Sequence, residues 1–137
     1  MKAKTYLFTV SENSFYRRLV DAVHGTDLLV FPKVRLMDLI EWSSVEELEM
    51  YKYSVMAKHV DFLLCSSSGF KPVAVLELDD ATHWLPEVRE SDAVKNWACA
   101  ACSIPIIRFG GLEQTRPHMI RQRIDTVLKP TLRAVSV

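Results

Sequence analysis

The sequence predicts an α/β fold in which a mixed β-sheet is flanked by helices. Two apolar runs, at residues 60–65 and 72–79, are separated by a turn-rich gap around Gly69, which is typical of an antiparallel hairpin. The second run is followed by a helical segment and then by a further apolar run at 104–109. A strand, helix and strand in this order usually form a parallel pair. Antiparallel and parallel pairs in one sheet make that sheet mixed.

The first predicted elements are a helix and a strand. A helix is expected from Ser11, a suitable N-cap, because apolar residues then recur at helical spacing until Gly25. Residues 28–36 are expected to form a strand. Pro32 lies inside this strand and cannot donate a ladder hydrogen bond, which predicts an edge strand or a bulge.

Helices are also predicted on both sides of the hairpin. Residues 44–57 have a polar-faced helical pattern, with Ser44 as the cap and Glu47 at capping-box spacing. A second helix is expected at about residues 88–102, after Pro86. The hairpin therefore connects two helical segments.

The last predicted elements are a short strand and a closing helix. Residues 104–109 are apolar except for Arg108 and are followed by a glycine pair, which indicates a short buried strand. The last helix is expected at about residues 112–128, before Pro130. The predicted order is helix, strand, helix, two strands, helix, strand, helix.

Composition limits the classes of protein that fit. The chain has 137 residues, of which 49% are apolar, so we expect one domain over residues 1–137 with its core at about 11–110. Seventeen basic and seventeen acidic residues cancel, so net charge gives no indication of a polyanionic partner. No apolar run is long enough to span a bilayer, and the N-terminus lacks a signal-peptide pattern. We therefore expect a cytoplasmic protein that does not interact with membranes.

Three cysteines, Cys65, Cys99 and Cys102, lie in apolar surroundings. Their odd number does not fit a secreted disulfide framework. Cys99 and Cys102 have the spacing of a zinc or redox pair, but the sequence has no second pair of this kind. Buried structural thiols are the favoured interpretation.

Acidic residues stand at the ends of the two hairpin strands. Asp61 begins one strand, Glu77 and Asp79 end the other, and Asp80 and His83 follow. Carboxylates near a core lose hydration and need a partner. A divalent metal ion is a common partner for such a group.

Strand geometry ranks these acids. In an antiparallel pair Asp61 and Glu77 can face one another, which makes them the best-placed metal ligands. Side-chain alternation puts Glu77 and Asp79 on one face, and Asp80 on the other, where it is expected to serve a turn or a cap. An alternative interpretation of Glu77 is a buried ion pair with an arginine such as Arg108.

These residues carry a resemblance to a known superfamily. The chain resembles the PD-(D/E)XK nucleases, in particular the branch of the very-short-patch-repair endonucleases, and the uncharacterised DUF2726 domains. The match covers roughly residues 11 to 110. The matching positions are Glu12, Asp61-Phe62, Glu77-Leu78-Asp79, His83, the helix around Arg89 and Asp92, and Arg108-Phe109.

The resemblance implies a restriction-endonuclease-like three-layer fold, a mixed sheet flanked by helices in αβ(α)ββαβα order. It also implies a nuclease that cleaves phosphodiester bonds, most readily in DNA, with Mg²⁺ or Mn²⁺ as cofactor. Asp61, Glu77 and Asp79 would hold the metal, and Glu12 and His83 would complete the catalytic set. Asp79 stands where the superfamily most often has lysine, so His83 would take over part of that role.

Basic residues are candidates for phosphate contacts. Arg89 and Lys95 could touch nucleic acid, although a salt-bridged solvent face with Asp92 is the default for such helix spacing. Local basic strips exist despite the neutral total. They comprise Arg17-Arg18, Lys33 with Arg35, and the segment from Arg116 to Arg123 that includes Arg121.

Two alternatives to the nuclease interpretation remain open. Asp79 in place of lysine, and the small size of the chain, also fit an inactive nuclease-fold module that binds DNA or a protein. The helices could instead pair with a second copy in a homodimer. Glu12 has an alternative too, because a carboxylate in a first helical turn is stabilised by the helix dipole whatever its function.

Overall fold

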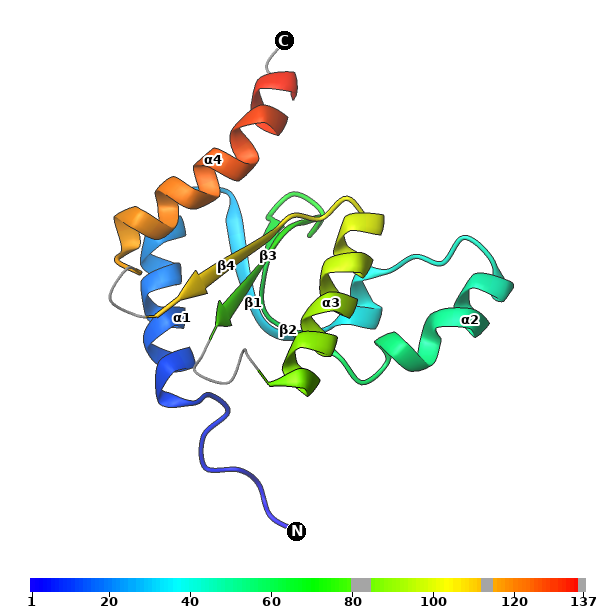
Figure 1. The fold of residues 1–137 in the computed structure, drawn as a ribbon. Coiled ribbons are helices and arrows are strands. Elements are labelled where there is room, and N and C mark those ends of the chain that lie inside the picture. The colour runs from blue at the N-terminus through cyan, green and yellow to red at the C-terminus, as the bar shows by residue number, and fades with distance from the viewer. Residues whose placement is uncertain (80–84, 112–114, 136–137) are drawn as a thin grey trace.

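The structure is a computed structural model, and it describes residues 1–79, 85–111 and 115–135, with the backbone alone for 129–135. The elements follow the predicted order, with one added 3₁₀ turn (Figure 1). They are α1 (Val10–Val23), β1 (Leu28–Arg35), η1 (Leu36–Leu39), α2 (Val45–Val55), β2 (His59–Ser66), β3 (Pro72–Asp79), α3 (Pro86–Ala101), β4 (Ile106–Gly110) and α4 (Pro117–Val135).

The four strands form one mixed sheet in the order β1-β2-β3-β4. The pairs β1–β2 and β2–β3 are antiparallel, and β3–β4 is parallel. The antiparallel β2–β3 hairpin and the parallel pair connected through α3 were both predicted from the sequence. The strand β1 lies at one edge of the sheet, as predicted from Pro32. An edge strand pairs on one side only, so it tolerates a residue without a backbone N–H. The strand β4 forms the opposite edge.

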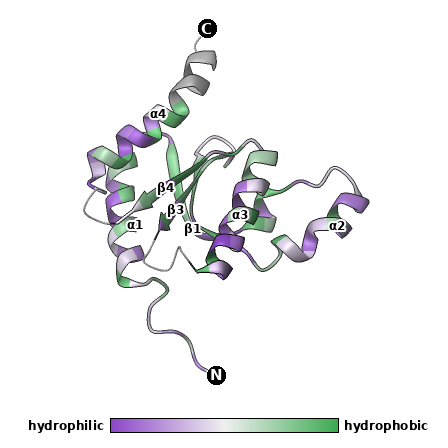
Figure 2. Cartoon of the chain, in the orientation of Figure 1, coloured by the Kyte–Doolittle hydropathy of each residue, from purple (hydrophilic) through white to green (hydrophobic). Residues whose placement is uncertain are grey.

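Helices cover both faces of the sheet (Figure 1). On one face, Phe15 and Leu19 of α1 and Ile120 of α4 pack against strand residues such as Phe62 and Leu76. On the other face, α3 packs over the sheet, and α2 lies beside α3. Figure 2 shows apolar residues gathered along the strands and polar ones on the outer sides of the helices. The chain therefore has an apolar core on each side of one sheet.

The cap of α1 differs from the prediction. The helix begins at Val10, and Thr9, not Ser11, is its N-cap. The Thr9 hydroxyl accepts from the Glu12 N–H, and the Glu12 carboxylate accepts from the Thr9 N–H, which is a complete capping box. The glutamate three residues after Thr9 decides the cap. At α2 the predicted cap is confirmed, because the Ser44 hydroxyl accepts from the Glu47 N–H, while the Glu47 carboxylate accepts from the N–H of Ser43, one residue before the cap.

The bounds of α4 also differ from the prediction. The helix begins at Pro117 and continues through Pro130 to Val135, so both predicted ends were wrong. Proline is favoured in a first helical turn, where its missing N–H has no intrahelical partner to lose. The apolar stripe that includes Ile120 and Ile124 packs against α1 and the sheet, and this packing holds the first two thirds of the helix in place. In the described part of the chain, no helix combines the length and apolarity needed to cross a membrane.

The cysteines occupy structural positions. Cys65 and Cys99 are buried in the core on the α3 face. Burial raises the pKa of the Cys99 thiol to about 11, so the thiol stays protonated at neutral pH. Cys102, at the C-terminal cap of α3, is half-buried.

Candidate functional site

Asp61 and Glu77 meet at the end of the β2–β3 ladder. Phe62 is paired with Leu76, and the same register places Asp61 opposite Glu77 one position further on. The Asp61 N–H donates to Glu77 Oε2 at 2.8 Å, and the Leu78 N–H donates to Asp61 Oδ2 at 2.8 Å. Each carboxylate thus accepts a backbone N–H from the neighbouring strand where the regular ladder stops. The two carboxylates lie together, as the strand pairing predicted.

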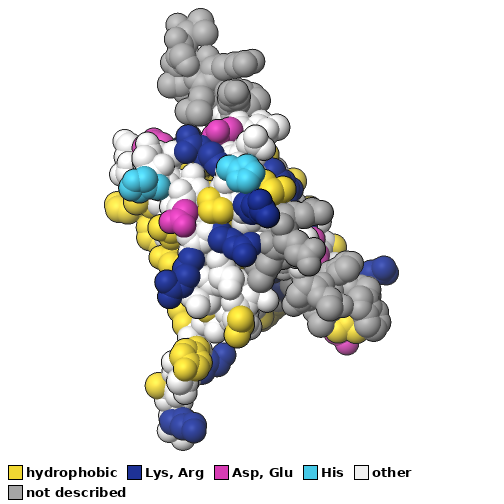
Figure 3. Space-filling model, turned by 90° about the vertical axis from the view of Figure 1, so that its left-hand side faces the viewer, with side chains coloured by type: hydrophobic (Ala, Val, Ile, Leu, Met, Phe, Trp, Pro, Cys, Tyr) yellow, Lys and Arg dark blue, Asp and Glu magenta, His cyan; other side chains and the backbone are white. Residues whose placement is uncertain are grey.

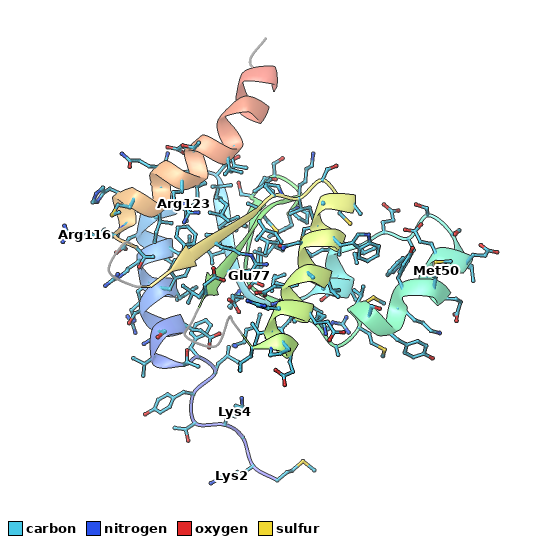
Figure 4. All side chains as sticks on the ribbon, in the orientation of Figure 1. Lys2, Lys4, Met50, Glu77, Arg116 and Arg123 are labelled. Carbon is cyan, nitrogen blue, oxygen red and sulfur yellow. The ribbon has the colours of Figure 1, made fainter. Side chains whose placement is uncertain are left out.

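Lys95 of α3 completes this group. Its Nζ lies 2.7 Å from Glu77 Oε1, and the side chains of Lys95 and Glu77 are only 14% and 2% exposed. Both oxygens of Glu77 therefore have a partner, one from the neighbouring strand and one from the helix. Figure 4 shows Glu77 at the centre of the molecule, between the sheet and α3. The buried ion pair of Glu77 is formed with Lys95 and not with Arg108.

Arg108 organises a second group beside the first. It is in register with Glu77 in the β3–β4 pair, but its guanidinium lies 3.6 Å from Asp79 Oδ1 and 3.3 Å from Asp92 Oδ1. It also donates to Asn96 Oδ1 at 2.9 Å. These contacts tie the ends of β3 and β4 to α3.

The orientation of α3 corrects one prediction. Asp92 and Lys95 were expected on a salt-bridged solvent face, but both pair with residues of the sheet. Lys95 lies one turn before the buried residues Ala98 and Cys99, so the same helical stripe carries it toward the sheet. Arg89 lies outside this stripe and is exposed.

A pocket of about 300 Å³ opens beside these residues. Its charged lining holds five carboxylates and two cations, an excess of negative charge. We call it the acidic pocket. It is lined by Asp61, Glu77, Leu78, Asp79, Glu87, Val88, Ser91, Asp92, Lys95 and Arg108.

The electrostatics of Asp61 follow from its position. Burial raises the pKa of Asp61 to about 7, and the neighbouring Glu77 carboxylate adds to the rise. The Leu78 N–H and the Lys95 ammonium oppose it only in part. Near neutral pH, the Asp61 carboxyl group therefore either holds a proton or needs a further cation nearby to stay ionised.

The residues present fit a hard divalent cation. Among the residues that the structure describes, no group of three or more His, Cys, Asp and Glu side chains is arranged to hold a metal ion. Mg²⁺ keeps several waters and usually takes one or two protein carboxylates. The incompletely neutralised pair Asp61 and Glu77 meets that need, whereas it would not make a four-ligand zinc site. Asp79 lines the same pocket with Arg108 as its ionic partner.

The other predicted site residues lie elsewhere or outside the described residues. Glu12 pairs with Lys33 at 3.0 Å and caps α1, and it does not line the acidic pocket. Partial burial raises the pKa of Glu12, but hydrogen bonds from Thr9 and the Lys33 ammonium outweigh it and hold the pKa below its usual value. Asp80 and His83 fall within residues 80–84, outside the described part of the chain.

The role of Lys95 as the partner of Glu77 was the main feature that the sequence did not reveal. Lys95 was predicted only as a residue that could touch phosphate. The signal that could have found it is its spacing from Ala98 and Cys99, which marks it as a residue of the buried stripe.

Comparisons with known proteins identify a family. The model of a family described as "Protein of unknown function (DUF2726)" matches residues 4–128. No curated protein and no solved structure matches the chain.

Proposed function

The chain belongs to the DUF2726 family, whose description assigns no activity, and we propose from the acidic pocket that it is a metal-dependent nuclease acting on DNA. The observation that carries the proposal is the pair Asp61 and Glu77 at the pocket wall, with the Lys95 ammonium 2.7 Å from Glu77. Two carboxylates on two strands can hold a divalent ion, and a lysine on a helix can stabilise charge on a phosphate, and both contributions promote phosphodiester hydrolysis. The element order αβ(α)ββαβα also supports the proposal, since it is the order expected of a restriction-endonuclease-like fold.

The charge of the pocket supports a cation requirement. Five carboxylates against two cations would repel a phosphodiester. Asp61 and Glu77 would hold Mg²⁺ or Mn²⁺, and Asp79 stands beside them on the same strand face. When bound, such an ion supplies a Lewis acid that polarises the phosphate and makes a bound water more acidic.

Lys95 supplies the positive charge that the position of Asp79 lacks. Its ammonium is held by Glu77 inside a largely buried site, where its position is fixed before substrate binds. From there it can donate a hydrogen bond to the attacking water or to a phosphoryl oxygen that gains charge in the transition state. Arg108 keeps Asp79 and Asp92 in place. A proton-transfer role of His83 stays a prediction.

The test is a cleavage assay on supercoiled plasmid, single-stranded DNA and RNA, with Mg²⁺, with Mn²⁺ and with EDTA. The wild-type chain should nick or cut DNA only with a divalent ion. The variants Asp61→Asn and Glu77→Gln, purified in the same way, should be inactive. Folded wild-type protein that cleaves none of these substrates would overturn the proposal.

A second candidate function has its own support. Without any ion, backbone N–H groups and Lys95 already donate to both oxygens of Glu77 and to Oδ2 of Asp61, and an inactive nuclease-fold module that binds DNA or a protein would show the same contacts. The two functions differ in metal affinity. An inactive module of this kind should bind Mn²⁺ no better than its Asp61→Asn variant.

A further inference from the structure

A second hollow lies across strand β4 from the acidic pocket. It has a volume of about 160 Å³ and faces α4, and we call it the α4 hollow. Its lining comprises Phe109, Gly110, Thr115, Met119, Gln122 and Arg123. Gly110 is in register with Asp79, which lines the acidic pocket. The end of β4 therefore separates the two hollows.

The ridge between the hollows is bare backbone. Gly110 is exposed, and a Cβ built on it would meet no atom within 4 Å. The same is true of a Cβ at Gly111, which has a φ of +83°. Residues without side chains let another chain approach the backbone closely. Among the described residues, the Gly110 backbone thus leaves room for an extended ligand to pass from one hollow to the other.

Arg123 flanks this crossing, and Arg116 adjoins Thr115, which also lines the α4 hollow. The Arg123 guanidinium stacks 4.3 Å from the centre of the Phe109 ring, and its Nη1 donates to the Arg108 carbonyl at 2.6 Å. These contacts fix the guanidinium at the wall of the α4 hollow while the side chain stays exposed. Arg116 is exposed at the start of α4. In the described part of the chain, neither Arg116 nor Arg123 has an ion pair.

Although the net charge is zero, the side of the molecule formed by α1 and the first part of α4 has an excess of basic residues. Residues 10–23 together with 116–128 contain five arginines and three acids. Figure 3 views this side and shows Lys and Arg side chains outnumbering Asp and Glu. Arg18 of α1 donates at 3.0 Å to Oγ1 of Thr115, which precedes α4, and Arg121 of α4 donates at 3.4 Å to the Ala22 carbonyl of α1. Arg116 and Arg123 are left to meet a ligand.

We propose that the α4 hollow binds the sugar–phosphate backbone of the nucleic-acid strand whose next phosphate enters the acidic pocket. The strand crosses β4 at Gly110, and Arg116 and Arg123 contact its phosphates. This inference rests on the proposed nuclease function and names the path of its substrate. Contacts of this type do not read base edges, so affinity should depend on salt and little on sequence.

The test measures the anisotropy of a short fluorescein-labelled DNA duplex and of a single strand in Ca²⁺, across a series of NaCl concentrations. Gly110→Glu places a carboxylate in the path without a clash, and it should weaken binding roughly tenfold or more. Gly110→Lys, with the same backbone change, should bind at least as well as the wild-type chain. Arg116→Gln and Arg123→Gln should each weaken binding roughly tenfold and lower the salt slope by about one.

The matched control is Arg35→Gln, which removes an exposed arginine at β1, the opposite edge of the sheet. It should bind like the wild-type chain. Arg123 also packs on Phe109, so if its variant is unfolded by circular dichroism, Gly110→Glu and Arg116→Gln decide the question. Folded Gly110→Glu and Arg116→Gln proteins that bind DNA as tightly as the wild-type chain would overturn the inference.

The two proposals fail separately. If the wild-type chain cleaves nothing but loses DNA binding in Gly110→Glu, the path of the strand stands and the nuclease proposal falls. If cleavage depends on Asp61 but is the same in Gly110→Glu, the nuclease proposal stands and the path falls.

Discussion

Two Lys–Glu ion pairs join a helix to the sheet, one on each face, and they differ in what surrounds them. Lys33 of β1 pairs with Glu12 of α1 at 3.0 Å, and Lys95 of α3 pairs with Glu77 of β3 at 2.7 Å. In the first pair the strand carries the lysine, and in the second it carries the glutamate. By distance alone the two pairs would be assigned the same role.

The contacts of Glu12 explain its position by a structural role alone. Its side chain is 15% exposed, it caps α1 together with Thr9, and it lies where the helix dipole favours a carboxylate. Glu77 is buried, and a second carboxylate, Asp61, lies against it beside a pocket. A structural ion pair gains nothing from that extra charge. The second carboxylate, Asp61, and not the ion pair itself, is therefore the reason that we propose the functional site at Glu77 and not at Glu12.

The largest expected difference is in activity. Asp61→Asn and Glu77→Gln should each lower the rate of metal-dependent DNA cleavage by more than about 100-fold, because each removes a negative oxygen that would hold the cation. Glu12→Gln makes the same carboxylate-to-amide change in the other ion pair, and it should cleave DNA at the wild-type rate. Plasmid nicking under single-turnover conditions measures this. Loss of cleavage in Glu12→Gln as well, in a folded protein, would end the distinction between the two pairs.

Truncation of the glutamates should separate the pairs by stability. Glu77→Ala leaves the Lys95 ammonium, which is 14% exposed, without its partner, and it should lower the free energy of unfolding by about 3 kcal/mol or more. Glu12→Ala removes a cap contact and a partly exposed ion pair, at a cost of about 1 to 2 kcal/mol. Urea denaturation without divalent ions measures both. Equal losses would show that burial does not distinguish the two glutamates.

The pH dependence of stability should have opposite signs at the two sites. The pKa of Asp61 is raised from 3.8 to about 7, so its contribution is fully present below about pH 3.8 and is lost as the pH rises through about 7. At pH 8 without metal, Asp61→Asn should therefore be more stable than the wild-type chain by about 1 to 3 kcal/mol. Added Mg²⁺ should close this gap by stabilising only the wild-type protein.

Glu12 gives the reverse dependence. Its pKa is lowered from 4.5, so its contribution is present above that value and is lost as the pH falls further. The stability difference between Glu12→Gln and the wild-type chain should vanish toward low pH, whereas that of Asp61→Asn should grow toward high pH. Unfolding curves at a series of pH values test both signs. Parallel pH profiles for the two variants would contradict the pKa assignments.

The smallest expected effect concerns the cap that holds Glu12. Thr9→Ala should lower the free energy of unfolding by about 1 kcal/mol, because the Glu12 N–H loses its acceptor. Ser11→Ala, in the first helical turn, should change it by less than about 0.5 kcal/mol. Thermal unfolding of the two variants compares them. A larger loss in Ser11→Ala would mean that the helix begins where the sequence pattern first placed it.

What could be predicted from the sequence depended on local pattern. The hairpin and the facing of Asp61 and Glu77 were predicted from antiparallel pairing. The register that brings the two together also depends on a shift between Leu64 and Cys65, which the sequence pattern did not reveal. The partner of Glu77 was not predictable, because it depends on how α3 is rotated over the sheet. That rotation is decided by the burial of Ala98 and Cys99, a tertiary effect that brings Lys95 inward.

Competing local signals explain the other errors. Thr9 and Ser11 are both good caps, and only the reciprocal bond with Glu12 decides between them. Pro130 predicted a helix end, but α4 continues through it. The ion pair of Glu12 with Lys33 joins residues that are far apart in the sequence. Lys33 also has a φ of 51°, a backbone conformation that the sequence pattern did not predict.

Isothermal titration calorimetry with Mn²⁺ at pH 8 tests most directly whether Asp61 and Glu77 form a cation site. The wild-type chain and Glu12→Gln should bind the ion alike, and Asp61→Asn and Glu77→Gln should bind it at least about tenfold more weakly. Equal Mn²⁺ binding by all four folded proteins, or none by the wild-type chain, would contradict the metal site and the nuclease proposal with it.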